Sequence, residues 1–243
     1  AVSVKASGSR GFLGDLNFHG ELRLSDLAVA RPGAGGKLDA RWTAIQSSAA
    51  KPWLFTVDGR GDGFRTGLGE LDRLLGPRPR LKLQATVGHD VIGVTGARLD
   101  GDKAGLGAKG LVGPKGALKL ALDWTAQGPF QVGPVEISGA VKGGGALTGS
   151  MMSPRADLTT DVAAIDIPRL PLKAAHIVLS FVKNPSGFAG QIAVNADSEF
   201  GPARARSDFH FVENGVDLTG LDADAGGVKA RGALSLRGAE PSA

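Results

Sequence analysis

Apolar and polar residues alternate along most of this chain. Over residues 38–44, 81–87 and 118–124, Leu, Val, Ala or Trp occupies every second position, and mostly charged or polar residues lie between them. Side chains of a β-strand point alternately to the two faces of a sheet, so this period of two indicates strands that are apolar on one face only. Further runs of this kind lie at 135–141, 192–200, 207–212 and 215–221.

Sequences typical of tight turns separate these runs. They are Asp58-Gly59, Asp100-Gly101, Gly113-Pro114-Lys115-Gly116, Gly143-Gly144-Gly145, Asn184-Pro185-Ser186-Gly187 and Asn214-Gly215. The tripeptide Arg60-Gly61-Asp62, which adhesive proteins also use, is interpreted as a turn as well. The chain is therefore predicted to run through one hairpin after another.

Three stretches repeat the same order of strand, Gly- and Asp-rich turn, and strand. They are residues 24–27 running into 35–40, 94–99 into 105–110, and 218–221 into 226–232. Such repeats are typical of an architecture that grows by adding strands, in which each unit buries its apolar face against its neighbours. We predict an all-β fold for residues 1–243, formed as one elongated, curved, antiparallel-rich sheet of repeated hairpins.

Two segments depart from this pattern, and a third is unusually apolar. Residues 68–75 have apolar positions at helical spacing and stop at Gly76-Pro77, which predicts one short helix. Residues 165–172 contain two prolines, which cannot donate to a sheet, and this predicts a bent edge strand or a crossover. The run at 176–182 is the most apolar of the chain and is a candidate for burial on both faces.

Composition narrows the class of protein. Glycine is the outlier, because 38 of 243 residues are about 16%, whereas a usual share is roughly 7%. The chain has no Cys, and its formal net charge of +4 includes no long run of like charges that would indicate a nucleic-acid partner. It begins at Ala1 without a Met or a signal peptide, so we expect a fragment of a longer protein.

Signatures of catalysis are poor. The four histidines show no pair at metal-ligand spacing, and no Gly-x-Ser-x-Gly motif occurs. Gly105, Gly107 and Gly110 match the dinucleotide fingerprint in letters, but the following Leu111-Val112-Gly113-Pro114 cannot begin the helix that this motif requires. We expect no enzyme, no catalytic residue, no cofactor and no metal site.

The inward-facing strand positions are the candidate functional surface. The predicted lining residues are Leu81, Leu83, Val87, Leu118, Leu120, Leu122, Trp124, Val135, Ile137, Ile192, Val194, Phe209 and Phe211. Two such faces can meet in a sandwich and fill an ordinary core. The aromatic share of 5%, the absence of Tyr and the many inward Ala and Gly favour a curved sheet that is not closed by a partner and forms a hydrophobic groove.

Several tracts resemble the TamB branch of the AsmA-like family of Gram-negative envelope proteins. They are the helical residues 67–76, the tract 162–172, residues 215–221 and the recurring Leu-x-x-Leu before a Gly-rich turn, and the resemblance covers nearly all of the chain. It implies a taco-shaped β-groove that reaches across the periplasm from an inner-membrane anchor and carries phospholipid toward the outer membrane. It also implies a role in outer-membrane protein assembly through the barrel TamA.

This sequence shows neither the anchor nor a segment identifiable as the one that engages TamA, so we expect both to lie outside it. The lipid species, the direction of transport and its energy source are not encoded in any recognisable motif. The alternative is a structural or adhesive β-solenoid with a solid core. Stacked solenoids often carry Asn ladders, and Asn occurs here only at positions 17, 184, 195 and 214.

Overall fold

The computed structural model describes residues 2–12, 14–25, 33–132, 135–167, 170–185, 187–212 and 215–237. They form β1 (Val2–Arg10), β2 (Leu16–Ser25), β3 (Ala34–Gln46), β4 (Trp53–Thr66), α1 (Gly69–Leu75), β5 (Arg80–Val87), β6 (Ile92–Asp100), β7 (Ala104–Val112), β8 (Ala117–Gln127), β9 (Phe130–Val132), β10 (Val135–Ser150), β11 (Pro154–Asp166), β12 (Leu172–Asn184), β13 (Gly187–Ser198), β14 (Gly201–Val212), β15 (Gly215–Ala225) and β16 (Val228–Arg237), with a 3-10 turn η2 (Pro114–Gly116) before β8. The predicted short helix near residues 68–75 is confirmed as α1.

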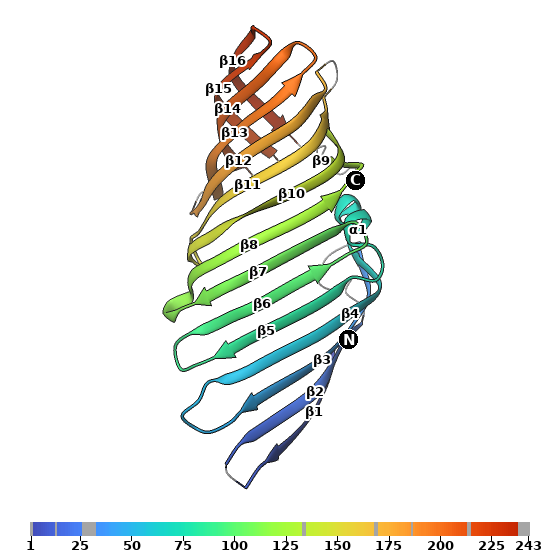
Figure 1. Cartoon of the computed structure of the whole chain (residues 1–243), viewed down its shortest axis with the longest axis vertical. Helices are drawn as coiled ribbons and strands as arrows, with labels where there is room; N and C mark the ends of the chain where they lie inside the picture. Colours follow the sequence, from blue (N-terminus) through green and yellow to red (C-terminus); the bar gives the residue numbers. More distant parts are fainter. Residues whose placement is uncertain are drawn as a thin grey trace.

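The strands form one sheet in which neighbours in sequence are neighbours in space. The order runs from β1 to β16, with the short β9 taking the place of β8 beside the first residues of β10. Every strand pair is antiparallel, and β1 and β16 are the two edges of the described sheet. Figure 1 shows a long, twisted and curved sheet whose last strands, β15 and β16, pass behind β12 and β13 in this view. The predicted all-β, curved antiparallel fold is confirmed.

Hairpin connections lie where the three sequence repeats place them. Residues 24–40, 94–110 and 218–232 supply the pairs β2–β3, β6–β7 and β15–β16. Stacked solenoids return to parallel neighbours, so the uninterrupted antiparallel order describes a different architecture. Leu27, Ser186 and Asn214, which belong to predicted hairpins, lie outside the described residues.

Three predicted turns are wrong, because their residues lie inside long strands. Asp58-Gly59 and Arg60-Gly61-Asp62 belong to β4, and Gly143-Gly144-Gly145 belongs to β10. Glycine serves a second purpose in this sheet, which is to leave room for large rings on the neighbouring strand. A Cβ atom added at Gly143 would lie within 2.4 Å of the Trp124 indole.

The same close approach recurs along the sheet. The rings of Phe18 and Trp42 lie against Gly8 and Gly20, where an added Cβ would lie 2.4 and 2.8 Å from a ring atom. An aromatic ring that covers a strand glycine shields backbone that a glycine alone leaves open. Part of the glycine excess therefore belongs to strand interiors and not to turns.

The proline-containing segment 165–172 is neither an edge strand nor a crossover. Ile165 of β11 pairs with Leu172 of β12, so the residues between them connect two adjacent strands, and Pro168 and Arg169 lie outside the described residues. The prediction that residues 176–182 are buried on both faces is also wrong. Ile177 and Leu179 are half-buried on one face, whereas Val178 on the other face is 40% exposed, because no second layer covers the sheet there.

The best-packed part of the molecule lies across β10 to β13. Its buried cluster consists of Ile137, Val141, Val162, Ile165, Leu172, Ala175 and Ala196, with Ile167 and Leu170 of the β11–β12 connection packed against it. Helix α1 lies near the same side of the sheet, where the Glu70 carboxylate accepts a hydrogen bond of 3.1 Å from the Gln131 N–H of β9. These contacts anchor one side of the sheet and leave the rest of its apolar side chains without a covering layer.

Candidate functional site

Cross-strand register places apolar residues in three continuous rows on one face of the sheet, which we call the apolar face. The first row is Val4, Leu22, Ala40, Gly59, Leu81, Leu99, Leu106, Trp124, Gly143, Thr160, Ile177, Val194, Ala205, Ala223 and Ala230. It crosses the described sheet from β1 to β16. Thr160 is its single interruption by a polar side chain.

Two further rows run parallel to the first, the second next to it and the third beyond the second. The second row is Ala6, Gly20, Trp42, Val57, Leu83, Ala97, Ala108, Leu122, Gly145, Leu158, Leu179, Ile192 and Ser207. The third row is Gly8, Phe18, Ala44, Phe55, Ala85, Val94, Gly110, Leu120, Leu147, Ala156, Phe181, Gly190, Phe209, Leu218 and Leu234. Together they make an apolar band about as long as the sheet itself.

Eleven of the thirteen predicted lining residues lie on this face. Eight belong to the rows, namely Leu81, Trp124, Val194, Leu83, Leu122, Ile192, Leu120 and Phe209. Val87 and Leu118 continue the face beyond the third row through Ile92 and Val112, and the Phe211 ring lies 5.6 Å from that of Phe209. Ile137 belongs to the buried cluster instead and is only 8% exposed, and the partly buried Val135 packs against that cluster.

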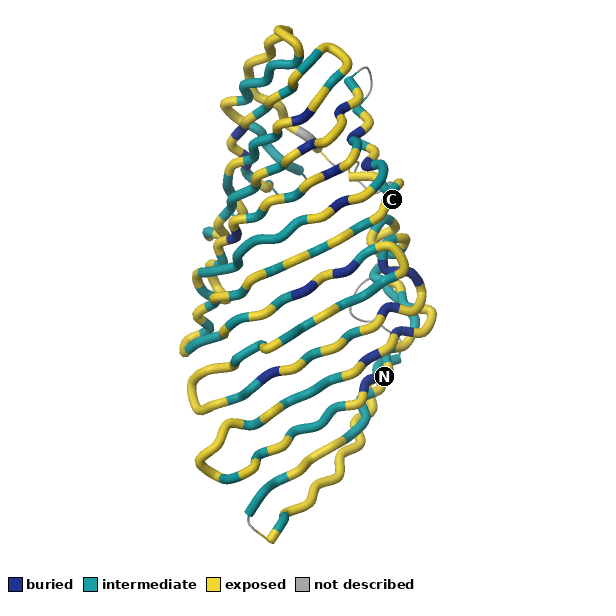
Figure 2. The backbone as a smooth tube through the Cα atoms, in the orientation of Figure 1, coloured by how far each residue is buried: buried dark blue, intermediate teal, exposed yellow. Residues whose placement is uncertain are grey.

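Little covers the apolar face. In the part of the chain that the structure describes, no large side chain is fully buried. Figure 2 shows mostly exposed and partly buried residues along the strands, with short buried stretches between them. A packed sandwich of this size would bury large side chains between its layers. The inward faces therefore do not meet, which answers the question that composition left open.

The apolar face is nevertheless the more sheltered of the two. Most of its Leu side chains, such as Leu83 and Leu120, are half-buried, whereas Leu54 and Leu111 on the opposite face are 45% and 47% exposed. Side chains of one type lose more solvent contact on the inside of a curve than on its outside. This difference is what curvature of the sheet toward the apolar face produces.

Several aromatic residues that were not among the predicted lining residues also lie on this face, next to one another or next to predicted ones. Toward the C-terminal strands, Phe188 has ring centroids 5.7 Å from Phe181 and 6.4 Å from Phe211. Toward the N-terminal strands, Phe18 lies 5.8 Å from Trp53, and Trp42 lies 6.2 Å from Phe55. The alternate positions of Trp53 and Phe55, and of Phe181 in the run 176–182, were a usable signal, but the pairing of the strands was needed to bring the rings together.

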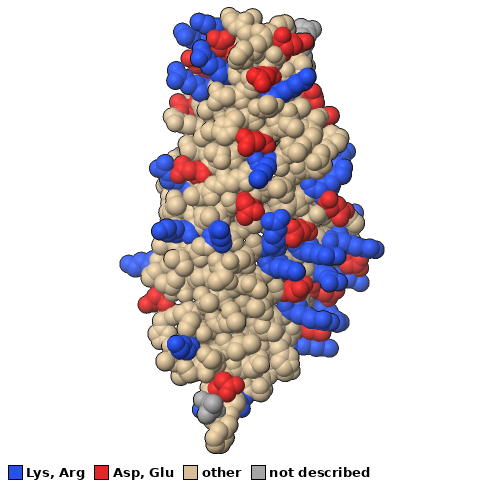
Figure 3. Space-filling model, in the orientation of Figure 1, with Lys and Arg blue, Asp and Glu red and all other residues tan. Residues whose placement is uncertain are grey.

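The opposite face is charged, and its ions are paired both within strands and across them. Arg98 contacts Asp100 at 2.8 Å and Asp123 at 3.2 Å, while Arg23 contacts Asp39 at 3.5 Å. Figure 3 shows acidic and basic side chains next to one another along the surface in view. Such exposed pairs add little stability each, and their main effect is to keep this face in water.

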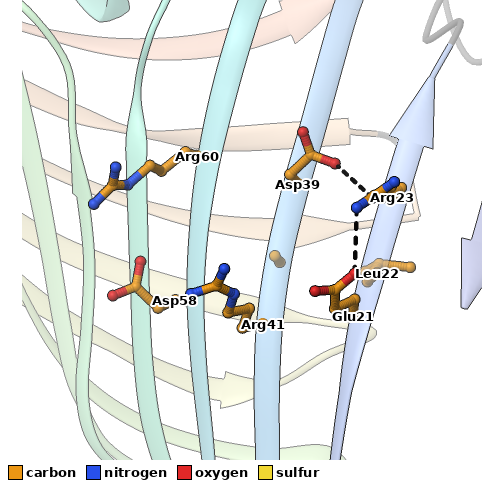
Figure 4. A pocket seen from close by; sticks show the side chains of 8 residues that line it. Glu21, Leu22, Arg23, Asp39, Arg41, Asp58 and Arg60 are labelled. Atoms are coloured by element: carbon orange, nitrogen blue, oxygen red, sulfur yellow. Dashed lines mark hydrogen bonds and ion pairs between the residues drawn. The ribbon is translucent and has the colours of Figure 1, made fainter. Parts of the chain in front are cut away.

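Hollows occur on the charged face, but they do not define a binding site. One of about 440 Å³ lies over β2, β3 and β4, where Figure 4 shows Arg23 between Asp39 and Glu21. A second of about 730 Å³ is lined by Lys82, Arg98 and Asp123 among others. Both are gaps between upright, exposed side chains of neighbouring strands, open to solvent and without a buried polar group to orient a ligand.

The four histidines do not gather into a site. His176 makes a cross-strand contact of 2.7 Å with Asp161 on the charged face, with both side chains exposed. Among the described residues, no three His, Cys, Asp or Glu side chains are arranged to hold a metal ion, and no helix has the length and apolarity to span a membrane. The glycine motif 105–110 lies within strand β7.

Asp222 gives the charged face a dependence on pH that can be measured. Its carboxylate contacts Arg231 of β16 at 3.3 Å and Arg206 of β14 at 3.4 Å, and hydrogen bonding from Arg231 first, with the charge of Arg206 in addition, lowers the pKa of Asp222 below its ordinary value of 3.8. A lowered pKa in the folded state stabilises the fold above the ordinary value, and this contribution is lost as the pH falls through the folded-state value.

We therefore expect amide protection in β16, corrected for intrinsic exchange rates, to fall as the pH drops below 3.8. Asp222→Asn should lower that protection at neutral pH and reduce its change with pH. Hydrogen exchange read out by mass spectrometry checks both statements. Equal protection of β16 in the variant and the parent protein at neutral pH would contradict them.

Comparison with known proteins gives no further guide, because no family model, curated protein or solved structure matches this chain.

Proposed function

We propose that this chain is a non-enzymatic span of a lipid-conducting groove in the periplasm, which shields phospholipid acyl chains on their way between the inner and outer membranes. The observation that carries the proposal is the long apolar face: two rows of mostly apolar residues cross the described sheet and a third reaches β14, while no second layer covers them. A soluble protein rarely leaves so long an apolar surface without an occupant. The resemblance of the sequence to the TamB branch of the AsmA-like family points to the same occupant.

The dimensions of the face suit an acyl chain. From Leu118 to Trp124, six steps along β8 at about 3.4 Å each span roughly 20 Å. One leaflet of a bilayer provides about half of a 30 Å hydrocarbon core for its chains. Fifteen strands at a spacing of about 4.8 Å make a trough on the order of 70 Å long.

The energetics explain why such a face is needed. Exposing a chain of 16 carbons to water costs about 13 kcal/mol at roughly 0.8 kcal/mol per methylene. A floor that continues from strand to strand removes most of that cost, while the polar headgroup stays in water at the open lip. Since each step along the rows is chemically similar, the lipid meets no deep trap and slides without a catalytic group.

The wider role follows from the same resemblance. In TamB-like proteins the groove is anchored in the inner membrane and supports outer-membrane protein assembly with TamA, and we propose the same context here. The described strands would then be one length of the groove, with the anchor and the TamA-binding portion in other parts of the protein.

Native mass spectrometry of the chain purified from Gram-negative membranes in mild detergent tests the proposal. We expect masses that correspond to bound phospholipid, released as the collision energy is raised. A particle free of lipid under these conditions would contradict the groove and favour a structural or adhesive role for the same sheet. An apolar-face variant that loses the lipid, described in the Discussion, separates binding in the groove from carry-over of detergent-bound lipid.

A further inference from the structure

One lip of the apolar face combines cations with exposed apolar side chains. Three successive hairpin tips on the same side of the sheet form it: the β7–β8 turn with Lys115, the β10–β11 turn with Met151 and Met152, and the β12–β13 end with Lys183. Met151 and Met152 are 68% and 85% exposed. We call these four residues the Lys–Met lip.

The three tips are joined to one another. The Met151 N–H donates to the Gly116 carbonyl at 3.0 Å, and a Cβ added at Gly116 would lie 3.1 Å from the Met151 side chain. On the other side, the Ser153 hydroxyl donates to the Lys183 carbonyl at 2.7 Å. The three tips therefore form one continuous structural unit.

The Lys–Met lip opens directly onto the apolar face. Lys183 follows Ile177, Leu179 and Phe181 at alternate positions of β12, so it is the residue where that apolar stripe reaches the rim. Its ammonium lies 6.0 Å from the centre of the Phe188 ring, which fits a lysine whose stem rests on apolar surface while its charge stays in water. On the other side of the lip, Leu118 of the apolar face follows the turn that holds Lys115.

Among the described residues, no carboxylate forms an ion pair with Lys115 or Lys183, whereas the nearby Arg155 is paired with Asp157 at 3.1 Å. The opposite lip over β10 to β14 differs, because Glu136, Asp166, Asp197 and Glu199 lie at its strand ends with Lys173. Counting only residues that the structure describes, the two lips thus differ in charge over these strands.

We propose that the Lys–Met lip holds the headgroups of anionic phospholipids, with a phosphate at Lys115 or at Lys183 and the acyl chains running past Met151 and Met152 onto the apolar face. This inference rests on the proposed lipid groove and adds the lip at which the headgroup lies and the charge of the lipid. Opposite charge selects the headgroup, and the flexible, apolar Met side chains suit chains that pass over them.

Vesicle binding tests the lip. The full chain is mixed with vesicles of phosphatidylcholine alone or of phosphatidylcholine with phosphatidylglycerol, and bound protein is measured by flotation. Each lysine near an anionic surface contributes about fivefold in affinity, so Lys115→Ala with Lys183→Ala should weaken binding to the anionic vesicles roughly 25-fold. Met151→Ser with Met152→Ser should weaken binding to both kinds of vesicle.

A matched control is available on the opposite lip. Lys103→Ala with Lys173→Ala removes the same charge from exposed positions there and should leave binding within about twofold of the parent protein. Equal losses of binding in both double variants would show a general charge effect and would contradict the proposed headgroup site. Unchanged binding of the Lys115 and Lys183 variant would contradict it too. Millimolar inorganic phosphate should not displace the vesicles, and displacement would identify a free-phosphate site instead.

The outcome for the lip is separable from the outcome for the groove. The Lys115 and Lys183 variant should still carry lipid when purified in detergent, because the apolar face is intact. If the parent protein carries lipid and this variant binds anionic vesicles normally, the proposed headgroup site is wrong but the proposed lipid groove is still supported. If the parent protein neither carries lipid nor binds vesicles, both proposals fall.

Discussion

Leu120→Asp should empty the chain of phospholipid and leave its sheet folded. Leu120 lies in the third row between Gly110 and Leu147, near the middle of the sheet, where a lipid sliding along the rows must pass. A carboxylate there has to be kept hydrated, so it excludes an acyl chain from that step of the floor. We expect more than a tenfold loss of bound lipid in native mass spectra, which corresponds to at least about 1.4 kcal/mol.

The adjacent position supplies the control. Ala121 follows Leu120 in β8, is exposed and points to the charged face, so Ala121→Asp introduces the same side chain and the same charge on the wrong side of the sheet. This variant should carry as much lipid as the parent protein, and both variants should keep the same far-ultraviolet circular dichroism. Equal lipid content in the two variants would rule out transport or storage on the apolar face.

Gly143→Ala should destabilise the sheet by about 1–3 kcal/mol, the usual cost of overpacking. The new Cβ atom would lie 2.4 Å from the Trp124 indole, and Gly143 sits within the long strand β10, so the ring has to leave its place over the neighbouring strand. Urea unfolding followed by intrinsic fluorescence measures the change in the free energy of unfolding. The native emission should shift as well, since Trp124 is one of three Trp residues.

Gly96→Ala is the matched substitution at an open position. An added Cβ there meets no atom within 4 Å, and the position lies on a strand of the same sheet. It should be neutral or should stabilise the protein by up to about 1 kcal/mol, because it restricts the unfolded chain. If the two substitutions had the same effect on unfolding, the close fit between ring and glycine would not matter for this fold.

The two faces of the sheet were predictable from the sequence because alternation is a local property. A period of two decides which side chains share a face of one strand, and eleven of the thirteen predicted lining residues lie on the apolar face. Whether a side chain on that face is open to a ligand or covered by another segment was not predictable in the same way. Ile137 lies in an alternating run of apolar and polar residues, as Leu120 does, but Ile167 and Leu170 of the β11–β12 connection pack against its cluster. No pattern within the strand predicts that contact.

Glycine residues caused most of the wrong turn predictions. Gly143 lies under an indole ring in the middle of a strand, whereas Gly116 ends a turn and has a positive φ of 74°. Telling them apart requires the identity of the cross-strand neighbour, which depends on register. The burial expected for residues 176–182 failed for a related reason, because apolar content does not say whether a second layer exists.

Register also fixes how this sheet can change in length. Because the rows run across the strands, removing one whole hairpin shortens the floor by about 9.6 Å and leaves its cross-section and its two lips as they were. Removing a single strand would instead reverse the direction of every later strand and exchange the lips, and inserting a single residue within a strand would turn the following side chains to the other face. The reach of such a trough is therefore adjustable only in steps of two strands.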